Sequence, residues 1–186
     1  GTLRSGIWVP VLMLPRSLSR LFERLRGRAR TPPTLAAIYV SAAAGEAMHS
    51  LETAEALAGQ GLRGDRYCTG TGHWHPVESC ELTLISRQDL ERAGRRLGVG
   101  LDRGQHRRNL VVAGLRTRDL ADRRFRIGSA HFEYWKPRPP CGYLNQVTGE
   151  NTARALGPHS GVCLRILKSG RIRVGDRLIF EDPATD

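Results

Sequence analysis

The sequence lacks closely spaced cysteine pairs. The 186 residues include four cysteines, none of which forms a CxxC pair, namely Cys68, Cys80, Cys141 and Cys163. This spacing excludes zinc ribbons and zinc fingers, whose ligands come in such pairs. A chain of this length also builds a sizeable core without disulfide staples. We therefore expect four reduced thiols in a cytoplasmic protein.

Long apolar runs and aromatic residues are also scarce. The apolar run from residue 7 to residue 14 is much shorter than the roughly 18 residues that a membrane-spanning helix needs. Aromatic residues make up 6% of the chain, whereas proteins that bind single-stranded nucleic acid stack the bases on aromatic side chains. The two absences argue against a membrane-spanning protein and against a nucleic-acid partner.

Lysine is nearly absent, and arginine takes its place. Only Lys136 and Lys168 are lysines, whereas 27 residues are arginines, and the formal net charge is +11. Guanidinium groups bind phosphate and other oxyanions as a planar fork. Among ligands, this charge suits an anionic cofactor, an anionic membrane surface or nucleic acid.

Residues 1–34 differ in pattern from the rest of the chain. Seven arginines and one glutamate give this segment a large share of the positive charge. Apolar residues recur at helical spacing opposite a face of arginines; they are Leu14, Leu18, Leu21, Phe22 and Leu25. We expect an amphipathic helix followed by a linker at residues 31–33. The helix either packs on the next domain or lies on a membrane surface through residues 14–28.

Residues 35–182 predict one mainly β domain, because short apolar segments alternate with glycine-rich turns. Strands are predicted at residues 35–40, 81–85 and 109–112, and hairpins at 124–135 and 162–174. A helix is predicted over residues 88–97, with Ser86 as its N-cap. Strands do not alternate with helices in this pattern, which favours a β-barrel with a few short helices at its rim.

One of the four cysteines has unusual neighbours. Cys141 directly follows two prolines and precedes Gly142, and Arg138 lies three residues before it. The prolines fix the backbone and brace the turn. A thiolate on a rigid turn beside a cation suits a soft metal ion or sulfur chemistry. The alternative is a buried structural cysteine in a proline-rich turn.

Three other segments are rich in basic or polar residues, and the first and third also contain glycine. They are residues 61–73, 106–109 and 157–161. In the first, a flexible backbone lets two arginines clamp an anion while an aspartate holds an arginine in place. In the second, basic residues stand at the mouth of an apolar strand. The candidate binding residues are Arg63, Gly64, Asp65, Arg66, Arg107, Arg108, Asn109, Arg138 and His159. The alternative is that these segments are ordinary surface turns and solvated strand ends.

Taken in order, these segments resemble the MOSC domain, the module named after the C-terminal part of molybdenum cofactor sulfurase. The resemblance covers residues 35–182 and leaves residues 1–34 outside it. The matching stretches are Gly61–Tyr67, Leu82–Ile85 with the helix after it, Arg107–Gly114, Phe125–Gly128, Pro140-Cys141 and Gly170–Asp176.

The resemblance implies a strand-rich barrel that binds the molybdenum cofactor, molybdopterin. It implies that Cys141 is the family's cysteine, the catalytic residue that ligates molybdenum or carries sulfur. Arg107 and Asn109 match residues that hold the phosphate or the pterin, and we place the other candidate binding residues at the same site. Pyridoxal phosphate belongs to a different domain of the sulfurase, and Lys136 and Lys168 lie in no phosphate-binding loop, so we do not expect it here.

Three functions remain open at this point. The leading hypothesis is an oxidoreductase that reduces N-hydroxylated compounds and takes electrons from a donor protein. The first alternative is a non-redox carrier of sulfur or of the cofactor, with a persulfide on Cys141 and a sulfur-donor protein as partner. The second alternative is a basic module that binds a membrane or nucleic acid. We expect a cytoplasmic location, at the membrane periphery if residues 14–28 bind lipid.

Overall fold

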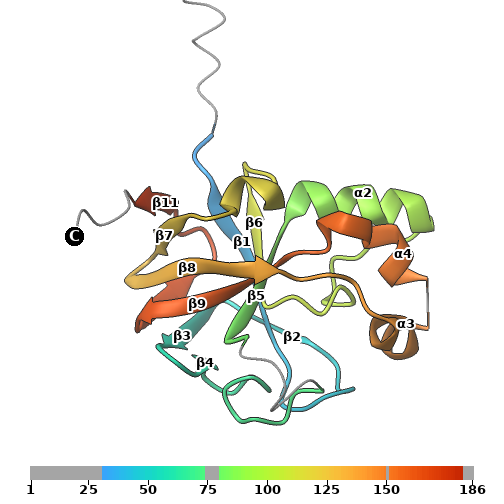
Figure 1. The fold of residues 1–186 in the computed structure, drawn as a ribbon, viewed down its shortest axis with the longest axis horizontal. Coiled ribbons are helices and arrows are strands. Elements are labelled where there is room, and N and C mark those ends of the chain that lie inside the picture. Colours follow the sequence, from blue (N-terminus) through green and yellow to red (C-terminus); the bar gives the residue numbers. More distant parts are fainter. Residues whose placement is uncertain (1–30, 74–79, 150, 182–186) are drawn as a thin grey trace, which may run out of the picture. The chain divides into compact units, whose positions relative to one another are not determined.

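The computed structural model describes residues 31–73, 80–149 and 151–181. All of them except Thr31 belong to a compact unit, Pro32–Asp186, in which strands predominate and helices gather at one side (Figure 1). The predicted helix at residues 14–26 lies outside the described residues. The division of the chain at residue 34 therefore stays a prediction.

Strands of the described residues form two sheets. The larger sheet has the order β11-β7-β8-β9-β5-β6-β1-β2, and the smaller has the order β10-β3-β4. The strands of the larger sheet are β1 Thr34–Val40, β2 His49–Leu51, β5 Leu82–Ser86, β6 Leu110–Ala113, β7 Arg124–Ile127, β8 Ala130–Pro137, β9 Val162–Lys168 and β11 Leu178–Glu181. The smaller sheet contains β3 Thr53–Leu57, β4 Gly61–Leu62 and β10 Gly170–Arg173. The prediction of a mainly β fold is confirmed.

The larger sheet has β2 and β11 as its edge strands, and β11 also comes close to the start of β1. An isolated bridge joins Thr34 to Arg177. Beside it the Leu178 N–H donates to the Pro33 carbonyl, and the Leu35 N–H donates to the Asp176 carbonyl, each at 2.8 Å. The larger sheet is therefore not closed into the expected barrel. We call the place where this bridge and these two hydrogen bonds join β1 to β11 the seam.

One strand–helix–strand unit corrects the expectation that strands and helices do not alternate. Strands β5 and β6 pair in parallel, and helix α2, Arg87–Leu97, connects them. Parallel neighbours need such a crossover, because a tight turn joins only antiparallel strands. The predicted helix and cap are confirmed, since Ser86 Oγ accepts a hydrogen bond from the Asp89 N–H at 3.1 Å.

The predicted hairpin at residues 162–174 is wrong. Strand β9 pairs with β8 and β5, whereas β10 leaves that sheet and pairs with β3. The chain leaves at Gly170, where a Cβ atom would lie 2.4 Å from the Ser129 backbone. The Ser129 N–H donates to the Arg171 carbonyl at 3.1 Å, and Ser129 Oγ accepts from the Arg171 N–H at 2.9 Å. The β7–β8 turn therefore holds β10 out of the larger sheet.

The apolar residues form two clusters. The first lies between the sheets and includes Leu84, Leu110, Phe125 and Phe132. The second lies under the helices and includes Leu90 of α2. Helix α4, Thr152–Leu156, adjoins α2, and helix α3, Gly142–Thr148, adjoins α4. Both α3 and α4 carry further members of this cluster. Loops at this end of the sheet and the first turn of α3 line the candidate site.

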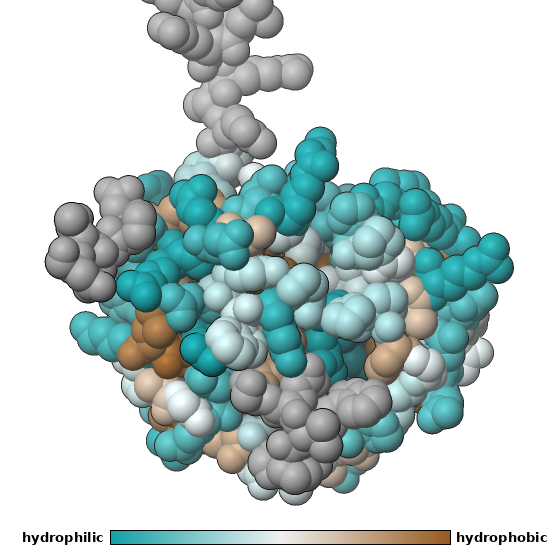
Figure 2. Space-filling view, in the orientation of Figure 1, coloured by the Kyte–Doolittle hydropathy of each residue, from teal (hydrophilic) through white to brown (hydrophobic). Residues whose placement is uncertain are grey.

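The face seen in Figure 2 is mainly hydrophilic, with a small hydrophobic area over the ends of β8 and β9 that lie near the β7–β8 turn. Large apolar side chains that are well exposed occur singly, as Val99, Trp135, Leu167 and Ile179, which is ordinary for a globular protein. Among the described residues, no helix has both the length and the apolar character required to cross a bilayer.

Candidate functional site

Four segments that are distant in the sequence meet around one cleft, which we call the arginine cleft. Its enclosed volume is about 40 Å³. It is lined by Ala44, Arg66, Tyr67, Gly72, His73, Arg107, Arg108, Arg138, Pro139, Cys141, Tyr143 and Leu144. Of the residues singled out in the sequence, the cleft brings together four arginines and the cysteine.

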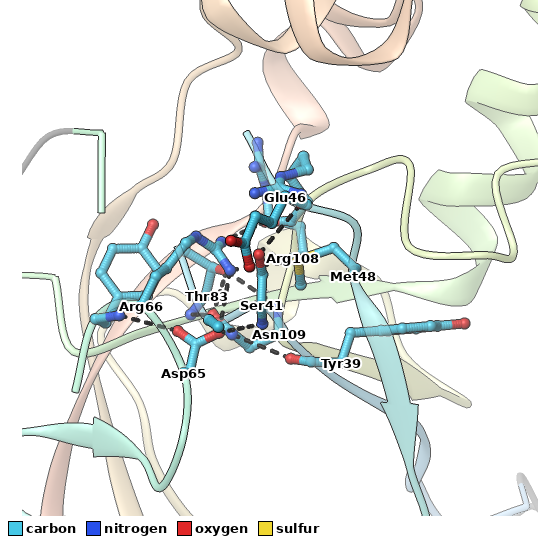
Figure 3. A network of polar contacts seen from close by, with 12 residues as sticks. Tyr39, Ser41, Glu46, Met48, Asp65, Arg66, Thr83, Arg108 and Asn109 are labelled. Atoms are coloured by element: carbon cyan, nitrogen blue, oxygen red, sulfur yellow. Dashed lines mark hydrogen bonds and ion pairs between the residues drawn. The ribbon is translucent and has the colours of Figure 1, made fainter. Parts of the chain in front are cut away.

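Asp65 fixes Arg66 in the wall of the cleft (Figure 3). The Asp65 carboxylate is fully buried and accepts hydrogen bonds from Arg66 Nη1 at 3.1 Å and from the Ser41 N–H at 3.0 Å. Arg66 Nη2 donates to the Arg107 carbonyl at 3.2 Å. Because the carboxylate is tied to two segments, the guanidinium group stays in one place.

Arg107 adopts a strained backbone conformation. Its φ of 59° lies in the left-handed region, which residues other than glycine rarely enter. Its guanidinium group donates to the Glu46 carbonyl. Burial and the neighbouring Arg66 lower the pKa of Arg107. This backbone conformation therefore accompanies the placement of the Arg107 guanidinium group near that of Arg66.

Arg108 is the most deeply placed cation of the cleft. Only 5% of the residue is exposed, and its Nε and Nη2 atoms donate to the Ser160 carbonyl at 2.7 Å and to Ser160 Oγ at 2.6 Å. Burial, and secondly Arg138, lower the pKa of Arg108 to about 10. A Cβ atom on Gly161 would lie 2.9 Å from Arg108 Nε, so the absence of a side chain at Gly161 makes room for the guanidinium group.

Arg107 and Arg108 bring positive charge to the cleft, and neither forms an ion pair with a carboxylate of the described residues. Arg66 contacts the Asp65 carboxylate, whereas Arg107 and Arg108 donate to carbonyl and hydroxyl oxygens. Like charges that share a buried site disfavour one another's charged form, in agreement with the lowered pKa values of Arg107 and Arg108. A bound oxyanion would relieve this repulsion and accept several charge-assisted hydrogen bonds.

Cys141 stands at the mouth of the cleft, partly exposed. It is the N-cap residue of α3, with extended backbone angles, and the backbone before it is held by a bond from the Arg138 N–H to the Gly161 carbonyl at 2.9 Å. Tyr143, in the first turn of α3, also lines the cleft, and its hydroxyl has no partner among the described residues. A thiol therefore opens into the same space as the guanidinium groups.

Five predicted site residues do not line the cleft. Asp65 is one of them, and it acts through its contact with Arg66. Arg63 is exposed and paired with Glu55 at 2.5 Å, and Gly64 is its exposed neighbour. The Asn109 side chain is buried; it accepts from the Thr83 N–H at 3.1 Å and the Thr83 hydroxyl at 2.9 Å, and donates to the Tyr39 carbonyl at 3.1 Å. It thus ties together β5, β6 and β1. His159 lines a separate hollow beside α2.

Sequence reasoning missed Tyr67, Tyr143 and Ser160. Tyr67 lies in the segment already singled out, and burial raises the pKa of its hydroxyl. Tyr143 is two residues from Cys141, so its proximity was a usable signal. Ser160 adjoins His159 in one turn, and no pattern in the sequence indicated that the serine rather than the histidine would contact Arg108.

Comparisons with known proteins identify the family of this chain. A model of the MOSC domain family matches residues 71–179, more than half of the chain. No sequence among the curated proteins shows a significant match.

Three solved structures share the fold. The YuaD protein from Bacillus subtilis is 14% identical, with a TM-score of 0.66 over 82% of this chain and 98% of that one. YiiM from Geobacillus stearothermophilus is 17% identical, with a TM-score of 0.61 over 83% of this chain and 77% of that one. YiiM from Escherichia coli is 17% identical, with a TM-score of 0.56 over 83% and 71% of the two chains. At identities this low, the likeness supports the fold alone.

Proposed function

Because this chain belongs to the MOSC domain family, whose members are associated with the molybdenum cofactor, we propose that its arginine cleft binds that cofactor and that the protein uses it to reduce N-hydroxylated compounds. The observation that carries the proposal is the meeting of one partly exposed thiol with four guanidinium groups in a single cleft. A thiolate suits a soft metal ion, and arginines suit a phosphate.

The donor set fits the two ends of the cofactor. Arg66, Arg107 and Arg108 would hold the phosphate, and the Cys141 thiolate would ligate molybdenum at the mouth. The enclosed volume of about 40 Å³ has room for little more than an oxyanion group, so the pterin would lie on the open side. Among the described residues, no cluster of three His, Cys, Asp or Glu side chains could hold a metal ion. Molybdenum would therefore have to arrive with the cofactor that supplies its other ligands.

In this proposal the residues of the protein bind and orient the cofactor. Asp65 keeps Arg66 fixed, and Ser160 keeps Arg108 fixed, so both cations are preorganised for an anion. When bound, the cofactor supplies two electrons, which together with two protons convert an N-hydroxyl group into N–H and water. A donor protein would replace the electrons. The basic surface suits an acidic partner.

The second candidate function is a carrier of sulfur, with a persulfide on Cys141. It is favoured by the partial exposure of this thiol beside cations, which stabilise a thiolate or a persulfide anion. It needs no metal.

Metal analysis of the protein produced in a host that makes molybdopterin tests these functions. We expect close to one molybdenum per chain, and reduction of benzamidoxime with reduced viologen as electron donor. The Cys141→Ser substitution should remove both the bound molybdenum and the reduction of benzamidoxime. Cys68→Ser is the matched control, because Cys68 is partly exposed and lies outside the cleft lining. Equal molybdenum in both variants would overturn the ligand assignment. A Cys141 persulfide in metal-free protein, seen by mass spectrometry, would support the carrier.

A further inference from the structure

A second cavity lies beside α2, on the other side of the segment that supplies Arg107 and Arg108. We call it the α2 cavity. Its volume is about 810 Å³, within the range of roughly 300–1,000 Å³ that is typical of small-molecule sites. None of the residues that line it also lines the arginine cleft. It therefore needs an explanation of its own.

The walls of the α2 cavity are largely apolar, and charged residues stand at its rim. The apolar residues are Ala36, Ala37, Leu90, Val99, Leu101 and Val111. The charged residues are Arg87, Glu91, Arg95 and Asp102, and none of these four forms an ion pair with any residue that the structure describes. Two positive and two negative groups balance one another, so the rim selects neither sign of charge.

His106 also lines this cavity and is completely buried. Its Nδ1 accepts a hydrogen bond from the Arg108 N–H at 2.9 Å, and burial, with the two neighbouring arginines, lowers the pKa of the ring to about 3. At neutral pH the imidazole is therefore uncharged, and its proton lies on Nε2. Nε2 has no hydrogen-bond partner among the described residues.

The nearest aromatic side chain does not supply the missing acceptor. The Tyr39 ring lies edge-on to the imidazole, with 5.2 Å between centroids and 79° between planes. The Tyr39 hydroxyl donates to the Asp102 carbonyl instead. A contact between an N–H group and an aromatic ring is much weaker than a hydrogen bond to oxygen.

We propose that the α2 cavity binds an uncharged, largely apolar molecule with a carbonyl-type oxygen, which accepts a hydrogen bond from His106 Nε2–H. The apolar walls bury the body of the ligand and disfavour a net charge, and the rim compensates for neither sign. The buried Nε2–H donor needs an acceptor on the ligand. His106 lines the α2 cavity, whereas the next residue, Arg107, lines the arginine cleft. The left-handed backbone conformation lies at this second residue. The chain would thus hold an anionic ligand and a neutral ligand on adjacent residues.

Two nearly isosteric probes test the role of the acceptor. Acetophenone carries a carbonyl oxygen, and α-methylstyrene carries a methylene group in its place. Binding of each to the full-length protein is measured by NMR, with the protein labelled with ¹⁵N at histidine. We expect acetophenone to bind at least about fivefold more tightly, as one net hydrogen bond would give. The Nε2–H signal of His106 should shift with acetophenone alone.

Two variants locate the binding. His106→Gln keeps an acceptor for the Arg108 N–H but moves the donor, and should remove the preference for acetophenone. Val99→Trp fills the mouth of the cavity from a position that is 44% exposed, so it tests the site even if the His106 variant does not fold. Ile179→Trp is its control, at a 38% exposed position on β11. Equal affinity for the two probes, no binding, or binding unchanged by Val99→Trp would overturn the proposal.

Discussion

At the scale of single residues, the arginine cleft depends on how each cation is held. Arg108 is the test case, because it is buried and bonded to Ser160 rather than to a carboxylate. We expect Arg108→Gln to weaken the binding of inorganic pyrophosphate, measured by calorimetry, on the order of tenfold to hundredfold, as the loss of a charge-assisted hydrogen bond would. Arg126→Gln, on the exposed side of β7, is the control. A change of less than twofold in both variants would place the anion site elsewhere.

His106 makes stability depend on pH. In the folded protein its pKa is about 3, below its ordinary value of 6.5. The unfolded chain therefore binds a proton at a pH at which the folded protein does not, so the contribution to stability is complete above pH 6.5 and is lost as the pH falls toward 3. Between pH 6.5 and 5 we expect the free energy of unfolding in urea to fall by about 2 kcal/mol more in the natural protein than in His106→Gln. If the free energy of unfolding changed with pH to the same extent in the natural protein and in His106→Gln, this prediction would be wrong.

Asn109 illustrates why the site was only partly predictable from the sequence. Its place beside two arginines suggested cofactor binding, but its side chain bonds Thr83 and Tyr39, which are far away in the sequence. We expect Asn109→Ala to lower the free energy of unfolding by roughly 2–4 kcal/mol, because it leaves buried groups unpaired. The folded fraction should bind pyrophosphate within about threefold of the natural affinity. A stable variant with lost affinity would restore the cofactor role.

At the scale of elements, the local signals were predictable and the pairing was not. The β7–β8 hairpin and the cap of α2 depend on neighbouring residues, and the structure confirms both. Two pairings depend on contacts between distant segments, namely the parallel pairing of β5 with β6 and the antiparallel pairing of β10 with β3 rather than with β9. Helix α3 directly after Cys141 was missed because glycine begins it, and glycine is a poor helix former.

Gly161, before β9, links an element to the site. Its φ is +126°, and a Cβ atom would lie 2.8 Å from the Leu84 carbonyl and 2.9 Å from Arg108 Nε. We expect Gly161→Ala to lower the melting temperature and also weaken pyrophosphate binding, because the guanidinium group must move. Gly175→Ala is the control, since Gly175 also has a positive φ, +96°, but no atom within 4 Å of its Cβ position. It should cost roughly 1–3 kcal/mol of stability and leave binding unchanged. Equal effects of the two on binding would contradict the role of Gly161.

At the scale of the whole molecule, the fold class and the family could be predicted from the order of motifs along the chain. The seam and the α2 cavity could not, because both arise from packing between distant segments.

The boundary of the described unit, Pro32–Asp186, sets where a shortened chain should begin. Pro33 already takes part, through its carbonyl bond to Leu178. We expect a chain that starts at Pro32 to fold and keep its molybdenum content. A chain that starts at Leu35, which lacks the Thr34 bridge, should melt at a lower temperature.

The same truncation tests membrane binding by residues 14–28. If that segment binds lipid, the full-length chain should sediment with acidic vesicles at low salt but not at high salt, and the chain that starts at Pro32 should not sediment at either. Equal sedimentation of the two chains would assign any lipid binding to the described unit.

The seam between β1 and β11 has a consequence for protein engineering. The first strand and the last strand of the described fold meet there, at the Pro33–Leu178 bond and the Thr34–Arg177 bridge. A short peptide could therefore join the two ends of the fold, with new ends opened in the exposed turn at residues 58–60 between β3 and β4. Such a circular permutant would keep the order of every strand in space and turn the weakest junction of the sheet into a covalent one.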